Sequence, residues 1–489
     1  MLLLIVVLSV VATGQNGSRA PETNESRTNP IYITRVTVID TKNGKELPDR
    51  TVILAGDRIT DVAKTKDARV PPGAKVVDGR GKFLIPGLWD MHAHPLAPER
   101  RDTYFSLFLT NGVTGVRDTG AWISLSEIHR WQQDLATGAL VGPRIVGVAG
   151  PLVDGPGVKH ARTGFPNETA VGTVNVTNAA DARAVVATLQ QQGADFIKVY
   201  NQVPREAFFA LADEAKHRSM PIIGHVPWSV TVAEASNAGQ RSMEHLDGPV
   251  LECAFASTPN LREQMVAGKV PPTLEILQSA LDHCDPGKMT DLFKLLAKNE
   301  TWQVPTLVQL LFTEKPDAAR DPRLKYVTPP IREEWAAMLT GMDKNLDLLH
   351  RIFLLKLDFV RAMRAQGVRF LPGTDSPSYP GTIAGFDLHD ELQLLVRAGF
   401  TPAEALKSAT CDAAEFMGKQ NDFGSVAPGK MADLVLLNAN PLTDIRNTTS
   451  ISAVFLMGEE FDRSALDAML KKAEAAVTVI SPPAAAPTK

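Results

Sequence analysis

The sequence predicts an α/β fold: a (β/α)8 (TIM) barrel with a small β-sandwich domain built from both ends of the chain. Three observations lead to this prediction. Short apolar runs alternate with amphipathic, helix-like runs between residues 84 and 420, which is the pattern of parallel β/α units. This part holds eight strand candidates, the number that closes such a barrel. Short β-branched runs flank it on both sides, at residues 31–83 and 421–462.

The first thirty residues predict export, to the periplasm or outside the cell. Residues 1–14 resemble a secretory signal peptide, because an apolar run from Leu2 to Val11 precedes the small residues Ala12-Thr13-Gly14. No Lys or Arg precedes Arg19, so an uncleaved tail is the alternative. The run is shorter than the roughly 20 apolar residues that span a bilayer, and no stable membrane span is expected. Residues 15–30 are rich in Asn, Ser, Thr and Pro and predict a flexible leader.

Two distant segments share the composition of a β domain. The β-branched runs Ile31–Ile39 and Thr51–Leu54 are separated by turn-forming residues such as Asn43-Gly44. Similar runs return at Ala432–Leu437 and Ile451–Leu456. We therefore assign residues 31–83 and 421–462 to one β-sandwich.

The barrel is assigned to residues 84–420. Its expected strands are Leu84–His92, Gly112–Arg117, Arg144–Gly150, Asp195–Tyr200, Pro221–Val226, Arg241–His245, Gln303–Leu307 and Arg369–Thr374. Amphipathic runs such as Ala180–Gln192 supply the connecting helices. The long connection Gly248–Thr301 and the polar insertion Pro316–Leu355 are expected to shape a substrate pocket. Residues 463–489 predict a C-terminal helix and a disordered tail.

Composition narrows the classes of partner. The 489 residues are 44% hydrophobic and 22% charged, with a net charge of −4, which is ordinary for a globular protein and offers no basic field for nucleic acid. A small molecule or a short peptide is the expected substrate, and a homo-oligomer is left open. Three cysteines, Cys253, Cys284 and Cys411, are too few and too scattered for a disulfide framework, so we expect buried thiols.

Metal-ligand residue types stand at the ends of several expected strands. His92 and His94 end the first strand on one face, with Cα atoms about 7 Å apart. Each group has a structural alternative when taken singly: a core histidine, a helix cap for Asp375, or an ion-paired Lys198. Barrel enzymes place catalytic groups at the carboxyl ends of strands, and the combination favours a metal site. Its members are His92, His94, Lys198, His225, His245 and Asp375.

These motifs resemble the amidohydrolase superfamily, over roughly residues 31–458. The resemblance rests on Pro86-Gly87-Leu88 with Asp90-Met91-His92-Ala93-His94, Ile197-Lys198-Val199, Gly224-His225, Glu244-His245, Gly373-Thr374-Asp375 and Val426 to Val435. Within the superfamily the chain looks most similar to the imidazolonepropionase-like, Xaa-Pro dipeptidase-like and ochratoxin amidase-like branch. This likeness implies two divalent metal ions bridged by a carboxylated strand-four lysine.

Carried over residue by residue, the resemblance implies one ion held by His92, His94, Lys198 and Asp375, and the other by Lys198, His225 and His245. Burial of Lys198 would favour its neutral amine, which can add carbon dioxide to form the bridging carbamate. Zinc suits the mixed N/O ligands best, although manganese, iron or cobalt could replace it. The ions would generate a bridging hydroxide, and Asp375 would act as base and then as acid.

The expected activity is hydrolysis of an amide C–N bond in a dipeptide or an N-acyl amino acid. The same site could hydrolyse a cyclic amide, a lactone or a phosphotriester, and a non-catalytic metal-binding barrel is the remaining alternative. His160, Tyr200 and Trp228 are candidate substrate contacts, each with an equal structural alternative. Val226-Pro227-Trp228 follows His225 where dipeptidases of this branch carry a tyrosine, which counts against proline specificity. Arg117-Asp118 is expected to be a structural pair.

Overall fold

A computed structural model describes residues 29–162, 165–169, 172–258, 260–267, 274–315 and 321–479. The predicted signal peptide, the leader up to residue 28 and the tail from residue 480 lie outside these ranges. Within the described residues, no helix is long and apolar enough to cross a membrane.

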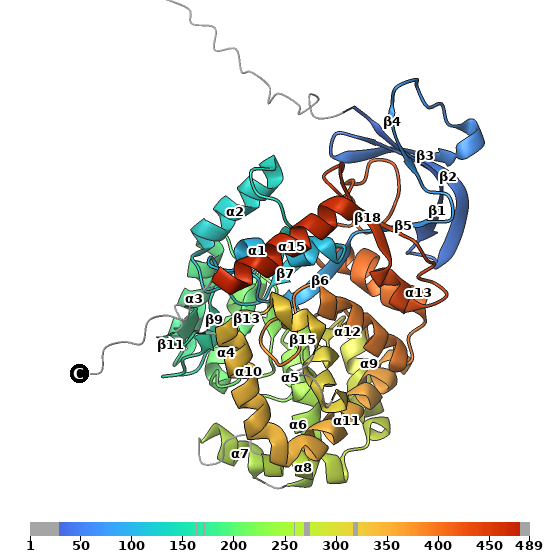
Figure 1. The fold of residues 1–489 in the computed structure, drawn as a ribbon. Helices are drawn as coiled ribbons and strands as arrows, with labels where there is room; N and C mark the ends of the chain where they lie inside the picture. Colours follow the sequence, from blue (N-terminus) through green and yellow to red (C-terminus); the bar gives the residue numbers. More distant parts are fainter. Residues whose placement is uncertain are drawn as a thin grey trace, which may run out of the picture.

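Both ends of the chain build one mixed sheet, which lies beside the main α/β body (Figure 1). Its strand order is β19-β18-β17-β5-β1-β2-β3, and β4 pairs with β1. Val435 of β17 pairs antiparallel with Ile85 of β5, which joins the two ends. Buried β-branched and leucine side chains give this sheet its own core. The strands are β1 (Ile31–Asp40), β2 (Lys45–Ala55), β3 (Arg58–Lys64), β4 (Lys75–Asp78), β5 (Phe83–Pro86), β17 (Leu434–Leu437), β18 (Ile451–Leu456) and β19 (Glu459–Asp462).

The main body is built on two parallel sheets with helices around them (Figure 1). One has the order β6-β7-β8 and the other β12-β9-β13-β14-β15-β16. The strands are β6 (Leu88–Ala93), β7 (Val113–Asp118), β8 (Arg144–Val148), β9 (Leu152–Asp154), β12 (Thr173–Asn175), β13 (Ile197–Val199), β14 (Ile222–Gly224), β15 (Gln240–Glu244) and β16 (Trp302–Val304). A small hairpin, β10 (Ala161–Arg162) and β11 (Phe165–Thr169), stands apart from both sheets. The α/β class with parallel strands is confirmed.

The first expected strand, Leu84–His92, is two strands. β5 belongs to the mixed sheet and β6 to the parallel one, because Pro86 has no N–H to donate and Gly87 makes a close approach to the neighbouring strand. A Cβ atom on Gly87 would lie 2.0 Å from the Thr114 hydroxyl oxygen. The chain therefore passes from one domain to the other at Pro86-Gly87.

The eighth expected strand, Arg369–Thr374, forms isolated bridges and not a ladder. Phe370 bridges to Gln303 of β16, and Ser376 bridges to Ala93 of β6, both in parallel orientation. The Met91 amide also donates to the Pro372 carbonyl at 2.9 Å. This extended segment thus contacts one strand of each parallel sheet.

The helices connect and cover these strands. The C-terminal helix α15 packs against α1, and α1 contacts β7 of the parallel body (Figure 1). The helices are α1 (Arg101–Thr110), α2 (Leu125–Thr137), α3 (Ala179–Gln191), α4 (Arg205–His217), α5 (Val232–Asn237), α6 (Asp247–Ser257), α7 (Leu261–Val266), α8 (Leu274–His283), α9 (Thr290–Lys298), α10 (Pro329–Met342), α11 (Leu346–Ala365), α12 (Phe386–Arg397), α13 (Pro402–Lys407), α14 (Ala413–Phe416) and α15 (Arg463–Val479).

The long connection after β15 contains a disulfide. Cys253 on α6 is bonded to Cys284, which directly follows α8, while Cys411 is a free, partly buried thiol. The expectation that all three cysteines are thiols is therefore wrong for two of them. Their spacing in the sequence does not show that α6 and α8 pack side by side.

Candidate active site

One cavity of about 320 Å³ opens at the carboxyl ends of the parallel strands. Its wall contains all six side chains that the sequence nominates as metal ligands: His92, His94, Lys198, His225, His245 and Asp375. They come from five places in the strand order. His92 lies in β6 and His94 just beyond it, Lys198 lies in β13, and the remaining three directly follow β14, β15 and the bridging segment 369–374.

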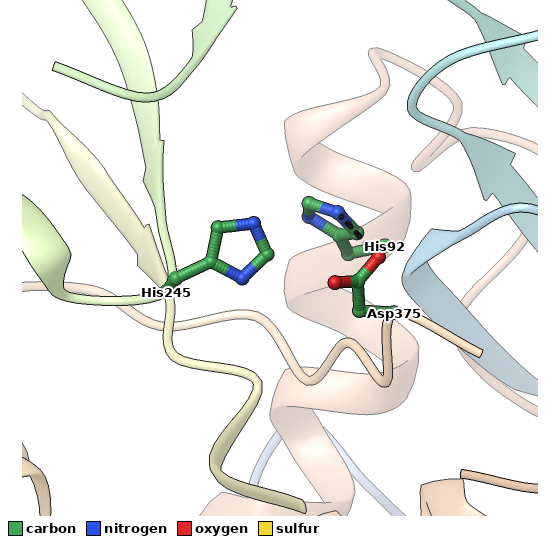
Figure 2. A group of neighbouring side chains, drawn as sticks. All are labelled: His92, His245 and Asp375. Atoms are coloured by element: carbon green, nitrogen blue, oxygen red, sulfur yellow. Dashed lines mark ion pairs between the residues drawn. The ribbon is translucent and has the colours of Figure 1, made fainter. Parts of the chain in front are cut away.

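The carboxylate of Asp375 contacts two histidines of the cluster and Gln309. Its Oδ1 atom lies 2.9 Å from Nε2 of His94 and 3.4 Å from Nε2 of His92. The side-chain amide of Gln309 donates to its other oxygen, Oδ2. Figure 2 shows His92, His245 and Asp375 facing one another, and their ligand atoms all lie within 4.8 Å of each other.

The four imidazole rings are held in the same manner. In each, Nδ1 contacts a fixed outer partner and Nε2 is the ring nitrogen left for the cavity. The Nδ1 contacts are His92 to Glu244 at 2.7 Å, His94 to the Gly120 carbonyl at 3.1 Å, His225 to Asn201 at 2.8 Å and His245 to Thr306 at 2.7 Å. A metal-binding histidine uses one nitrogen for the ion while an outer partner orients the other.

Two buried polar atoms at the centre have no hydrogen-bond partner within the described part of the chain. These are Nζ of Lys198 and Nε2 of His225. Unpaired buried polar groups are costly in a folded protein, and such atoms in a cluster of this composition are typical of a ligand-binding site. Neutral imidazole nitrogens, an amine and a carboxylate form a donor set that fits divalent metal ions.

Burial controls the charge states in the cluster. It lowers the pKa of Lys198 to about 8, against the opposing effect of Glu244 and Asp375. It also lowers the pKa of His245 to about 3, assisted by His92, and places the pKa of His225 well below its usual value. Burial alone would raise the pKa of Asp375, but the hydrogen bonds from His92 and His94 outweigh it and the pKa falls well below normal. Burial would lower the pKa of His94, but its contact with Asp375 outweighs burial and raises it. The cluster therefore offers neutral imidazoles at His225 and His245 and an ionised carboxylate at Asp375 near pH 7.

Two of the three candidate substrate contacts line the cavity and the third does not. His160 and Tyr200 line the cavity. The Nε2 atom of His160 lies 3.0 Å from the buried carboxylate of Asp154, and the Tyr200 ring packs between His160 and His225 with centroids 4.2 and 3.9 Å apart. Trp228 is not part of the cavity wall. It packs half-buried against the hydrophobic core, which matches its structural alternative.

Sequence reasoning missed several residues around the site. Gln309 holds Asp375, while Asn201 and Thr306 orient two of the histidines. Arg117 does not pair with Asp118 as expected: its guanidinium lies 3.1 Å from Glu244 and both side chains are fully buried. The sequence carries a signal for each residue, because Glu244 directly precedes a strand-end histidine and Arg117 is a charged residue inside a strand. It does not show that the two make contact, because they lie 127 positions apart.

Comparisons with known proteins agree with the geometry. The amidohydrolase family profile matches residues 356–461. Ochratoxinase from Aspergillus niger is 22% identical over 419 residues, covering 75% of this chain and 72% of ochratoxinase. Imidazolonepropionase from Idiomarina loihiensis is 40% identical over a short stretch of 62 residues, which is 13% of this chain and 15% of that protein.

Solved structures extend the likeness over nearly the whole chain. Bottromycin amidohydrolase is 26% identical with a TM-score of 0.72, covering 94% of this chain and 95% of that protein. A Xaa-Pro dipeptidase with bound methionine in its active site is 22% identical with a TM-score of 0.63, covering 88% and 100%; at this identity the likeness shows the fold alone. The family profile and the bottromycin amidohydrolase match confirm the resemblance to amidohydrolases that the strand-end motifs predict, and a short stretch is also similar to imidazolonepropionase.

Proposed function

We propose that this protein is a metal-dependent hydrolase that cleaves an amide C–N bond in a dipeptide or an N-acyl amino acid. One observation carries the proposal: six side chains from five strand positions line one cavity, with the Nδ1 atoms of all four histidines held by outer partners. The names of the similar proteins, among them bottromycin amidohydrolase and ochratoxinase, support hydrolysis of this kind of bond.

We further propose that the two parallel sheets close into the expected barrel. The support comes from backbone contacts at both gaps. Segment 369–376 bridges to β16 and to β6, and the Asp195 amide, just before β13, donates to the Val148 carbonyl at the end of β8 at 2.9 Å. A closed barrel would bring all six side chains around one axis.

The six side chains would hold two divalent ions, most suitably Zn²⁺. His92, His94 and Asp375 would hold one ion, His225 and His245 the other, and Lys198 would contribute to both as its carbamate. The neutral amine of Lys198 adds carbon dioxide and releases one proton, and its lowered pKa enlarges the neutral fraction. When bound, such ions lower the pKa of a water molecule and polarise the scissile carbonyl.

The chain's own residues then handle protons and substrate. Asp375 is ionised, so it can accept a proton from the attacking water and return it to the leaving nitrogen. Gln309 keeps its carboxylate in place through the bond to Oδ2. His160 and Tyr200 form the neighbouring wall and are proposed to contact the substrate. A cavity of about 320 Å³ lies at the lower end of the usual range for small-molecule sites.

Export remains part of the proposal. The Cys253–Cys284 disulfide supports it, because disulfides persist mainly in oxidising compartments. Amino-terminal sequencing of the protein recovered from periplasm or medium tests it, and a mature chain that still begins at Met1 would contradict a cleaved signal peptide.

The central experiment combines metal analysis with a substrate panel and the substitution Asp375→Asn. We expect two ions per chain, hydrolysis of dipeptides or N-acyl amino acids, and a 10²- to 10⁴-fold fall in rate in Asp375→Asn with metal largely retained. Asp213→Asn, at an exposed position on α4, is the matched control and should leave the rate unchanged. Turnover of lactones or paraoxon alone would reject the amidase assignment, and a fully active Asp375→Asn variant would remove Asp375 from the mechanism.

A further inference from the structure

The outer partners of the four histidines are not equivalent. His92 donates to the carboxylate of Glu244 and His94 to the carbonyl of Gly120. Both partners can only accept a hydrogen bond, so Nδ1 must carry a proton, and Nε2, which faces Asp375, is the nitrogen that an ion would bind. Of the four partners, only Glu244 carries a negative charge.

The outer partners of the other two histidines are uncharged. His225 contacts the amide oxygen Oδ1 of Asn201, and His245 contacts the hydroxyl of Thr306. The amide oxygen can only accept, so Nδ1 of His225 carries a proton, whereas the hydroxyl can donate as well as accept. Thr306 alone therefore does not fix which nitrogen of His245 carries the proton, and neither partner adds charge.

Glu244 is itself held in place. One guanidinium nitrogen of Arg117 lies 3.1 Å from Oε1 and 3.3 Å from Oε2 of Glu244, and the Ser242 hydroxyl donates to Oε1 at 2.7 Å. Arg117 is anchored in turn by the Met91 carbonyl and packs over the rings of Phe196 and Phe416. The carboxylate therefore cannot turn away from His92 without breaking a fully buried ion pair.

Asp375 adds to the same half of the cluster. Its Oδ1 atom already lies close to Nε2 of both His92 and His94. A carboxylate oxygen of Asp375 also comes within 4.8 Å of a ring nitrogen of His245, but its 2.9 Å contact is with His94. In the proposed assignment the half with His225 and His245 therefore depends on modification of Lys198 for its anionic donor. One half is thus assembled by the unmodified chain, and the other is not.

We propose that Glu244, held by Arg117, is a positioning residue that makes the His92–His94–Asp375 half the tighter metal position, filled before the His225–His245 half. A carboxylate that accepts from a metal-bound imidazole raises the basicity of the ring and fixes its orientation, and loss of such a partner typically weakens metal binding about 10- to 100-fold. The inference rests on the proposed metal-dependent function.

Titration of the metal-free, full-length protein with Zn²⁺ against a competing chelator tests this proposal, with no substrate present. The wild type should fill in two steps of unequal affinity. Glu244→Gln keeps an acceptor but removes the charge, and it should weaken the first step about 10- to 100-fold and leave the second unchanged. The matched variant Thr306→Val, at the outer partner of His245, should weaken only the second step.

An unchanged first step in Glu244→Gln, or a first step weakened by Thr306→Val, would overturn the assignment. Should Glu244→Gln fail to fold because Arg117 is left unpaired, the double variant Arg117→Met/Glu244→Met removes both charges together and must show the same loss. If the two metal-binding steps are unequal and the first depends on Glu244, but no amide is hydrolysed, the proposed function alone is refuted. Amide hydrolysis with a Glu244-independent first step would refute this inference alone.

Discussion

Lys198 should make metal uptake depend on dissolved carbon dioxide. This lysine is 1% exposed, and its amine has no hydrogen-bond partner among the described residues. Addition of carbon dioxide requires the neutral amine, and the product is an anion that can bind two cations. Metal-free protein in buffer stripped of carbon dioxide should therefore take up only one ion, and bicarbonate should restore the second.

The pKa of Lys198 sets the size of the effect. With a pKa of about 8, roughly 9% of the amine is neutral at pH 7, against about 0.03% for a lysine at the ordinary 10.5, a gain of about 300-fold. Protonation reduces the neutral fraction as the pH falls, to about 1% at pH 6. At a fixed concentration of dissolved carbon dioxide, uptake of the second ion should be about ninefold slower at pH 6 than at pH 7.

The assay follows uptake of Co²⁺ by its visible absorption at pH 6, 7 and 8, with dissolved carbon dioxide held constant. Lys198→Met keeps a side chain of similar length without the amine, and it should take up one ion regardless of pH or bicarbonate. Uptake of two ions in carbon dioxide-free buffer, or a second step with no pH dependence, would refute carboxylation of Lys198.

Two further predictions concern Gln309 and the disulfide. Gln309→Leu removes the amide that donates a hydrogen bond to Asp375. Because a hydrogen bond to a charged group is worth about 1.5–3 kcal/mol, kcat should fall about 10- to 100-fold at constant metal content. An unchanged kcat would exclude the contact from catalysis. The double variant Cys253→Ser/Cys284→Ser removes a link across 31 residues and should lower the free energy of unfolding in urea by about 3–4 kcal/mol. Its unfolding midpoint should equal that of the reduced wild type. A midpoint equal to that of the oxidised wild type would show that the bond does not form.

The site was more predictable than its surroundings, for a physical reason. Parallel strands end at a common edge, so strand-end residues such as His92, Lys198 and Asp375 could be brought together from sequence order alone. The outer contacts could not, because they depend on side chains that approach across the interior: Glu244 reaches His92 over 152 positions, and Gln309 reaches Asp375 over 66.

The fold shows the same limit. Alternation of apolar and amphipathic runs predicted the parallel strands, yet the run Leu84–His92 reads as continuous although Pro86-Gly87 divides it between two sheets. The spacing of apolar residues along a segment indicates that the segment is buried. It does not indicate which sheet provides its hydrogen-bond partner. The Cys253–Cys284 pair was missed for a related reason, because only the packing of α6 against α8 brings the two thiols together.

The pairing of β5 with β17 also imposes an order on biosynthesis. Leu84 forms its ladder with Leu436, so the ribosome must add about 350 further residues before the strand that leads directly into His92 acquires this neighbour. Until then β5 has an open edge, which can pair with other chains. Completion of the mixed sheet, whose strand β5 precedes the ligand-bearing β6, is thereby tied to translation of the last part of the gene, and a prematurely terminated product would keep this edge open to pairing with other chains.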